Sequence, residues 1–256
     1  MIHQTAIIDP TAKIADNVEI GPWTFIGPDV EIGEGTWIGS HVVIRTSTRI
    51  GKNNKIYQFA SVGEDPQDKK FQGEKTYLEI GDCNVIREFC TFNRGTAQDK
   101  GVTRIGNENL FMAYVHIAHD CLVGNNTIFA NNASLAGHVI VEDFVVMSGF
   151  SGASQSCRVG AHSFASMGSM IDKDVPPFVK VSGYYAKPFG LNIVGMRRRG
   201  FSAETMLALR RAYKVIYRQG LTIKQALEQL NEMLLTCQEV QLFIDFINAS
   251  ERGLVR

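Results

Sequence analysis

Two histidines and an aspartate stand close together at residues 116–120, in the segment His-Ile-Ala-His-Asp. An imidazole beside a carboxylate is the arrangement of a general base with an acidic partner, so we expect His119 to be the base and Asp120 its partner. A second chemistry is open, because His116, His119 and His138 could bind zinc and leave one coordination position for water. The two-residue alternation of a strand places His116 and His119 on different faces, which disfavours the metal site.

These residues lie inside an internal repeat with a period of six residues. Apolar side chains recur at every sixth position in three runs, from Ile2 to Val62, from Ile80 to Phe92 and from Ile105 to Ile171. Glycine follows many of them. Because six matches neither the helical period of about 3.6 nor a simple alternation, the pattern predicts a hexapeptide β-helix with one inward apolar residue per repeat.

Three hexapeptides close one triangular coil, so residues eighteen positions apart should lie on adjacent coils, roughly 4.8 Å from each other. By this offset His119 lies against Gly137, with Gln155 one coil further, and Asp120 lies against His138. A glycine next to the imidazole leaves its backbone N–H open to a ligand, as an oxyanion hole requires. The repeat therefore predicts a polar strip in which a base and an oxyanion donor are neighbours.

Two interruptions of the repeat predict loops at about residues 63–79 and 94–104. In the first, Asp68 and Glu74 occupy positions where the repeat requires apolar residues, so we expect a polar excursion rather than another coil. Long loops on a rigid scaffold tend to carry function, and the alternative is a pair of solvated loops. The sequence alone leaves both interpretations open.

The repeat ends at Ile171, and the segment 172–177 predicts a boundary. We interpret residues 180–188 as a connector. This places a β-helix in residues 1–188 and a helical domain in residues 189–256.

Three helices are predicted in the C-terminal part. Ser202 is a suitable N-cap for the first helix, and Gly220 is a stop signal. Thr222 and Gln225 have the spacing of a capping box for the second. The third should cover about residues 238–249.

Charge gives little indication of a macromolecular partner. The chain has 26 Lys and Arg and 26 Asp and Glu, so its formal net charge is zero. There is thus no electrostatic reason to expect a nucleic acid or an anionic membrane. Three consecutive arginines at 197–199 could bind a phosphate through their guanidinium forks, and solvated surface charge is the alternative.

The five cysteines form no Cys-x-x-Cys pair, which predicts buried reduced thiols in a cytosolic protein. The first ten residues, MIHQTAIIDP, lack the basic and apolar regions of a signal peptide. No apolar run is long enough to span a bilayer. We therefore expect a cytoplasmic protein without an integral membrane segment.

Four segments together resemble the UDP-N-acetylglucosamine O-acyltransferases of lipid A biosynthesis: HIAHDC at 116–121, LAGH at 135–138, DVPP at 174–177 and NIVGMRRRGFS at 192–202. The resemblance covers essentially the whole chain. It implies a homotrimer of left-handed parallel β-helices, each with a C-terminal helical domain, and an active site in a cleft between subunits. It also implies transfer of an (R)-3-hydroxyacyl group from acyl carrier protein to the glucosamine 3-position of UDP-N-acetylglucosamine. Neither a cofactor nor a metal is expected.

The resemblance assigns roles to individual residues. It makes His119 the general base, Asp120 its partner and Gly137 the donor to the oxyanion. It implies that the following residues contact the sugar, the acyl group or the nucleotide diphosphate: Asp68, Lys70, His116, His138, Gln155, Asn192, Arg198 and Arg199.

The chain departs from the family at Asn93 and Ser154, where histidine is frequent, and at Val194, where an acidic residue contacts the nucleotide. These departures leave a 3-amino sugar open as the acceptor. Met167 occupies the position that sets acyl-chain length, where a small residue admits a longer tail. We therefore expect a shorter hydroxyacyl chain.

Overall fold

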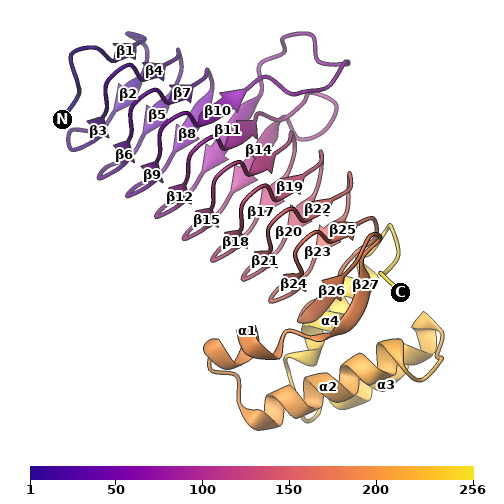
Figure 1. Ribbon diagram of the computed structural model, residues 1–256. Helices are drawn as coiled ribbons and strands as arrows, with labels where there is room; N and C mark the ends of the chain where they lie inside the picture. The colour runs from indigo at the N-terminus through magenta and orange to yellow at the C-terminus, as the bar shows by residue number, and fades with distance from the viewer.

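The computed structural model describes residues 1–256, which form three parallel β-sheets wound into a triangular coil, followed by helices (Figure 1). Most strands are two residues long, and up to β26 strands consecutive in the chain lie in different sheets. Within a sheet each strand pairs with the strand one coil away, as His116 pairs with Ser134 and Ile117 with Leu135. The eighteen-residue offset is the one that the hexapeptide pattern predicts.

The strands are distributed over the three sheets in the order of the coils. The first sheet contains β1 (Ile7–Ile8), β4 (Phe25–Ile26), β7 (Val43–Ile44), β10 (Ser61–Glu64), β13 (Thr91–Asn93), β16 (His116–Ile117), β19 (Ser134–Leu135), β22 (Gly152–Ala153) and β25 (Met170–Ile171). The second contains β2 (Lys13–Ile14), β5 (Glu31–Ile32), β8 (Thr48–Ile50), β11 (Tyr77–Ile80), β14 (Val102–Ile105), β17 (Leu122–Val123), β20 (Ile140–Val141) and β23 (Arg158–Val159). The third contains β3 (Glu19–Ile20), β6 (Trp37–Ile38), β9 (Lys55–Ile56), β12 (Val85–Ile86), β15 (Leu110–Phe111), β18 (Ile128–Phe129), β21 (Val146–Met147), β24 (Phe164–Ala165), β26 (Val179–Ser182) and β27 (Lys187–Leu191).

The repeated apolar residues fill the inside of the coil. Ile26 and Ile38 have no exposed surface, and burial of such a side chain stabilises the fold by roughly 1.5–3 kcal/mol. Phe92 meets Phe111 edge to face, with ring centroids 4.9 Å apart, and Phe111 stacks on Phe129 of the next coil at 5.1 Å. The result is a continuous column of side chains, which makes the coil a rigid support for its corners and loops.

One corner of the coil carries exposed aromatic residues. They occupy equivalent turn positions with left-handed backbone angles and are between 43% and 63% exposed: Trp23, Phe59, Phe89, Tyr114 and Phe150. The rings of Phe59 and Phe89 stack at 5.1 Å, and those of Phe89 and Tyr114 at 4.8 Å. We call these five residues the aromatic column. His41 and Asn132 occupy the equivalent turn positions between the stacked rings and the two outer members. A strip of exposed aromatic rings of this kind indicates an interaction surface.

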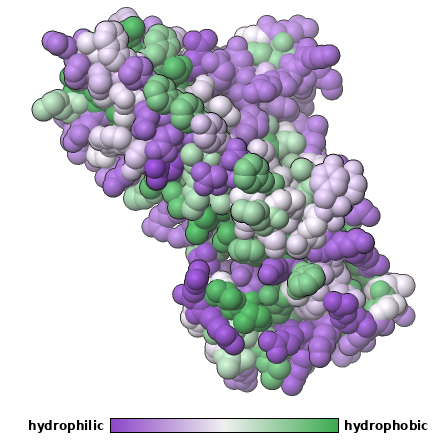
Figure 2. Space-filling model, viewed as in Figure 1, coloured by the Kyte–Doolittle hydropathy of each residue, from purple (hydrophilic) through white to green (hydrophobic).

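The two interruptions of the repeat are loops that project from one side of the coil (Figure 1). The first joins β10 to β11 through residues 65–76, and the second joins β13 to β14 through residues 94–101. Hydrophilic side chains cover most of the projecting part, whereas apolar side chains gather nearer the helical end of the face shown in Figure 2. Both loops are shorter than the repeat pattern predicted, because the last residues of each predicted loop belong to a strand of the second sheet.

The coil does not end at Ile171, and residues 180–188 are not a connector. β26 pairs in parallel with β24 and so adds a further strand to the third sheet. The chain then reverses, and β27 pairs antiparallel with β26. This hairpin has no six-residue pattern, so the repeat could not predict it.

Four helices follow the hairpin: α1 (Ile193–Arg198), α2 (Ala203–Tyr217), α3 (Ile223–Met233) and α4 (Val240–Asn248). Ser202 caps α2, and Thr222 forms the predicted capping box with Gln225 in α3. The short helix α1 was not predicted. Its six residues give too little periodicity to be distinguished from a loop.

The helices are attached to the end of the coil near the C-terminus. Asp174 receives a hydrogen bond of 2.6 Å from the Ser250 hydroxyl and forms a bridge with Leu254. None of the helices combines the length and the apolar character needed to cross a bilayer.

Candidate active site

His119 and Asp120 lie at a corner of the coil, directly after β16. The Asp120 backbone is left-handed, with φ near 59°, a conformation that aspartate adopts more readily than most residues. This turn directs its carboxylate to the preceding ring, so that His119 Nδ1 lies 2.9 Å from Asp120 Oδ2. Both side chains are buried. Because Nδ1 is held by the carboxylate, a neutral imidazole keeps its proton there, and Nε2 is the free base.

The second loop holds the Asp120 carboxylate. The backbone N–H of Thr96 donates to Oδ1 at 2.9 Å, and the Thr96 hydroxyl donates to Oδ2 at 2.6 Å. The Thr103 hydroxyl accepts a bond of 2.8 Å from the Asp120 backbone N–H. These contacts fix the carboxylate toward the imidazole. They also exclude the interpretation of this loop as purely solvated.

Sequence reasoning missed Thr96 and Thr103, since neither is part of the repeat. The position of the second interruption of the repeat could have indicated that this loop lies near the histidines. It leaves the coil at β13, and Thr91 of that strand pairs with His116. A loop that begins one coil away from the histidines has only a short distance to cover before it contacts them.

His138 lies one coil above Asp120 and faces both acidic neighbours. Its Nδ1 is 2.8 Å from Asp99 Oδ2 in the second loop and 3.9 Å from Asp120 Oδ2. The rings of His119 and His138 meet edge to face, with centroids 5.0 Å apart. Asp99, which the sequence did not single out, therefore orients the second imidazole as Asp120 orients the first.

Gly137 lies against the His119 ring on the adjacent coil. The His138 backbone N–H donates to the His119 carbonyl at 3.0 Å, which sets the register of the two coils. A Cβ on Gly137 would lie 2.5 Å from His119 Cε1 and 2.7 Å from Nε2, so only glycine fits. The Gly137 N–H donates to no acceptor within the chain. A free donor beside a basic nitrogen can stabilise an oxyanion formed at this point.

His116 does not join a three-histidine metal site. Its Nδ1 lies 2.7 Å from the Thr91 hydroxyl, and burial lowers the pKa of this imidazole. The side chains whose ligand atoms lie within 4.8 Å of one another are His119, Asp120 and His138. The Nδ1 atoms of His119 and His138 already contact the carboxylates of Asp120 and Asp99, so the contacts within this group favour acid–base chemistry.

The other residues named by the resemblance lie apart from this centre. Asp68 and Lys70 are in the first loop, and Gln155 is exposed at the corner one coil above Gly137. Arg198 ends α1, at the C-terminal end of the coil, whereas the two loops leave its middle coils (Figure 1). No hydrogen bond or ion pair joins these residues to His119, Asp120, Gly137 or His138 within one chain.

Asn192 and Arg199 are engaged around α1. The Asn192 side chain caps the helix by accepting from the Gly195 N–H at 3.0 Å, and it donates to the His162 carbonyl at 2.9 Å. The Arg199 guanidinium lies 4.1 Å from the ring centroid of Phe144. Met167 is 74% exposed at a corner of the coil.

The parallel coils, with a histidine–carboxylate pair beside a free backbone amide, define a hexapeptide-repeat transferase. Two family models match the chain. One is described as bacterial transferase hexapeptide (six repeats) and matches residues 29–64 and 103–137. The other is described as UDP N-acetylglucosamine O-acyltransferase, domain 2, and matches residues 174–255. The chain belongs to the UDP-N-acetylglucosamine O-acyltransferase family.

Relatives in sequence and structure support this assignment over the full chain. An acyl-[acyl-carrier-protein]–UDP-N-acetylglucosamine O-acyltransferase from Thiobacillus denitrificans is 62% identical, and the match covers 100% of this chain and 99% of that protein. The structure of LpxA from Acinetobacter baumannii is 54% identical with a TM-score of 0.98, over 100% and 99% of the two chains. That of UDP-N-acetylglucosamine O-acyltransferase from Moraxella catarrhalis is 52% identical, with the same TM-score and coverage. The predicted left-handed parallel β-helix is thereby confirmed.

Proposed function

We propose that this protein transfers an (R)-3-hydroxyacyl chain from acyl carrier protein to the 3-position of the glucosamine unit of UDP-N-acetylglucosamine. This reaction is the first step of lipid A biosynthesis. The observation that carries the proposal is the free Gly137 N–H next to the His119 imidazole, whose Nδ1 is held by Asp120. The names of the full-length relatives supply the two substrates.

In the proposed reaction, His119 Nε2 removes the proton of the sugar 3-hydroxyl while the hydroxyl oxygen attacks the thioester carbonyl. The resulting oxyanion accepts a hydrogen bond from the Gly137 N–H. The intermediate then collapses, the carbon–sulfur bond breaks, and the leaving thiolate takes the proton from Nε2. Asp120 stabilises the imidazolium that exists between these two steps. General-base catalysis of this kind contributes about 10²–10⁴ in rate, and an oxyanion donor about 10²–10³.

Substrate contacts come from more than one part of the molecule. Asp68 and Lys70 in the first loop, with His116, His138 and Gln155 along the coil, form the side of the site that holds the sugar and the acyl group. Asn192, Arg198 and Arg199 form the nucleotide-diphosphate side. Guanidinium groups suit this role because their forks match phosphate oxygens.

We further propose that the active form is a homotrimer with the site between subunits. Residues of the two sides do not contact each other within one chain, which supports a site completed by a neighbouring copy. The aromatic column offers an exposed apolar surface for that contact. All five cysteines are free thiols, which fits a cytoplasmic enzyme.

Met167 is proposed to limit the length of the acyl chain. Its side chain projects from the coil one step above Gly149, and its Cε would lie 3.5 Å from a Cβ at that glycine. Met167 belongs to the corner between the third and first sheets, whereas His119 lies at the corner between the first and second sheets, so a tail that extends from His119 along the first sheet would meet the thioether. We therefore propose a shorter hydroxyacyl substrate.

The test is acyl transfer measured by mass spectrometry, with UDP-N-acetylglucosamine and a panel of hydroxyacyl carrier proteins. His119→Ala should lower the rate at least about 100-fold while the oligomeric state stays unchanged. If His119 were only a structural residue of the coil, the wild type and His119→Ala would show the same rate of acyl transfer. Stoichiometric zinc on His119 and His138 in the purified protein would replace this mechanism with metal chemistry, and an amide product from a 3-amino acceptor would correct the sugar.

A further inference from the structure

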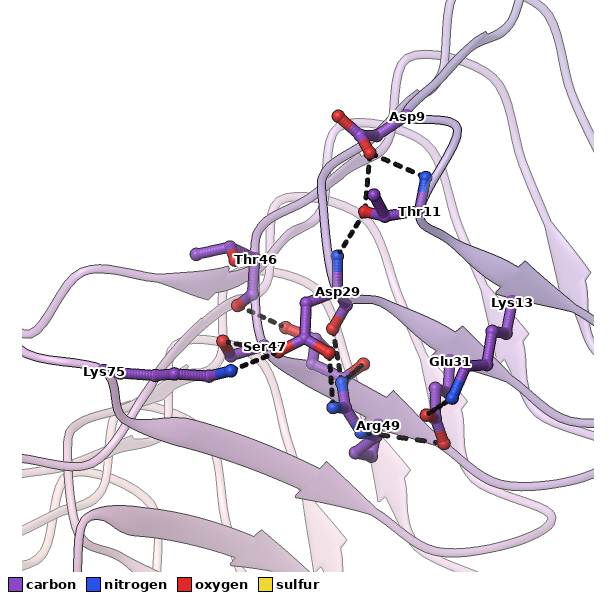
Figure 3. Close-up of polar contacts among 10 residues, drawn as sticks. Asp9, Thr11, Lys13, Asp29, Glu31, Thr46, Ser47, Arg49 and Lys75 are labelled. Carbon is purple, nitrogen blue, oxygen red and sulfur yellow. Dashed lines mark hydrogen bonds and ion pairs between the residues drawn. The ribbon is translucent and has the colours of Figure 1, made fainter.

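A cluster of charged side chains lies away from the candidate active site, where the first loop returns to the coil (Figure 3). Its centre is Asp29, at a left-handed corner with φ near 52°. Arg49 binds Asp29 twice, at Oδ1 at 2.6 Å and at the backbone carbonyl. Lys75, near the end of the first loop, pairs with the other carboxylate oxygen, Oδ2, at 3.1 Å. Ser47 donates to the same oxygen at 3.3 Å.

The contact between the loop and the coil at this point is polar. A cavity of about 280 Å³ separates the two, and its lining consists only of polar residues and a glycine: Asp29, Thr46, Ser47, Gly73, Glu74, Lys75, Thr76 and Arg94. Because no apolar side chain fills the space, hydrophobic contact contributes nothing to this cavity. The ion pair between Asp29 and Lys75 is a side-chain link across it, two residues before the chain enters β11.

The loop itself is a chain of hydrogen-bonded turns that leads from Lys75 back to the proposed substrate contacts. The Gln72 N–H donates to Glu74 Oε2 at 2.9 Å. The Phe71 N–H donates to the Asp68 carbonyl at 3.0 Å, and the Lys70 N–H donates to Asp68 Oδ1 at 2.9 Å. A displacement of Lys75 is thus transmitted along a short, internally bonded segment to Asp68 and Lys70.

The other end of the loop is held independently. Arg94 donates to the Gly63 carbonyl at 2.6 Å and pairs with Asp65, while the Asn93 amide donates to the Asp65 carbonyl at 2.8 Å. Arg94 and Asn93 are both buried. The second end enters β11 two residues after Lys75, where the Tyr77 N–H donates to the Gly101 carbonyl at 2.8 Å, and the Asp29–Lys75 pair attaches the residues just before this strand to an earlier coil.

We propose that Asp29, fixed by Arg49, is a positioning residue that anchors the first loop through Lys75 and so places Asp68 and Lys70 against the nucleotide sugar. This inference rests on the proposed function of those two residues. The anchor lies on an early coil and touches no reacting atom. Its effect should therefore appear in substrate binding and not in the chemical step.

Asp29→Asn is the decisive variant. Asparagine accepts the left-handed backbone as readily as aspartate, so the corner is not strained, and only the charge is lost. We expect the KM for UDP-N-acetylglucosamine to rise about 2- to 5-fold, with kcat within about twofold of the wild-type value. Lys75→Gln should give the same change. The double variant should raise KM no further than either single variant, because both substitutions remove the same Asp29–Lys75 pair.

A second measurement reports on the loop without any assay of activity. Trypsin cleavage after Lys69 and Lys70 should become several-fold faster in Asp29→Asn, because a released loop enters the protease more readily. Glu34→Gln is the matched control. It removes a similar cross-coil pair, Glu34 with Lys52 at 3.2 Å, that has no contact with the loop. Both KM and the cleavage rate should be unchanged in this variant.

The outcomes separate this inference from the proposed function. If the wild-type protein transfers no acyl group, the function is wrong, and the cleavage rates still decide whether Asp29 anchors the loop. If the wild type is active but Asp29→Asn matches Glu34→Gln in KM and in cleavage, the anchor is wrong. A fall in kcat at constant KM would also overturn the inference, because the anchor is proposed to act on binding of the nucleotide sugar.

Discussion

Replacing Gly137 with alanine tests the arrangement of base and oxyanion donor most directly. The added Cβ would lie 2.5 Å from His119 Cε1, whereas ordinary contacts of this kind begin at 3.4 Å. The ring or the corner must therefore move by about 1 Å. Movement of the ring breaks its 2.9 Å contact with Asp120, and movement of the corner stretches the 3.0 Å bond from the His138 N–H to the His119 carbonyl.

The expected loss follows from this displacement. A shift of about 1 Å in a catalytic group costs on the order of 10²-fold in rate, and loss of an oxyanion donor costs about 10²–10³-fold. Since the two groups act together, their losses do not add, and we expect kcat to fall about 10²–10³-fold, or roughly 3–4 kcal/mol in activation free energy. KM should change little, because the methyl group affects the reacting atoms and not the groups that hold the nucleotide.

The assay is steady-state acyl transfer, with the oligomeric state and thermal midpoint measured on the same samples. Gly149→Ala is the control, because it places a methyl group at the first residue of another corner turn, where the nearest atoms would be at 3.4 and 3.5 Å. That variant should retain the wild-type kcat. A kcat of Gly137→Ala within about threefold of wild type would refute the reasoning, since the imidazole and the amide could then not share one reacting centre.

Three further predictions concern other parts of the molecule. Thr96→Val removes the 2.6 Å hydroxyl bond to Asp120 but keeps the side-chain shape, and it should lower kcat about tenfold; an unchanged kcat would show that the second loop does not orient the carboxylate. Burial lowers the pKa of His162 from 6.5 to about 4, so the unfolded chain binds this proton first as the pH falls. The free energy of unfolding should therefore decrease between about pH 6.5 and 4, and His162→Gln should remove about 2 kcal/mol of that decrease in urea titrations; identical pH profiles would contradict this origin. Met167→Gly should shift the preferred donor toward longer hydroxyacyl chains in the mass-spectrometric panel, and an unaltered preference would exclude Met167 as the limit.

Much of the site could be predicted because the coil is periodic. Each coil repeats the same contacts, so two residues that are eighteen positions apart in the sequence lie next to each other on adjacent coils. This offset predicted Gly137 beside His119 and His138 beside Asp120, and the structure shows both pairs. A regular solenoid is one of the few folds in which simple subtraction predicts a tertiary contact.

The period fails where the chain leaves the coil. Thr96 and Asp99 contact Asp120 and His138 from the second loop, and Thr103 contacts Asp120 from the start of β14, through long-range hydrogen bonds. The hairpin of β26 and β27 and the short helix α1 likewise follow from packing at the end of the coil, and no local pattern announces them.

The sequence by itself thus determined the coil, its register and the adjacency of His119 and Gly137, because each depends on contacts that recur every eighteen residues. Only the tertiary structure decided how the loops dock: which residues orient Asp120 and His138, and that Asp29 and Lys75 hold the first loop. The physical reason is that each of these bonds occurs once in the fold, between residues far apart in the sequence. Such contacts produce no repeating pattern from which they could be predicted.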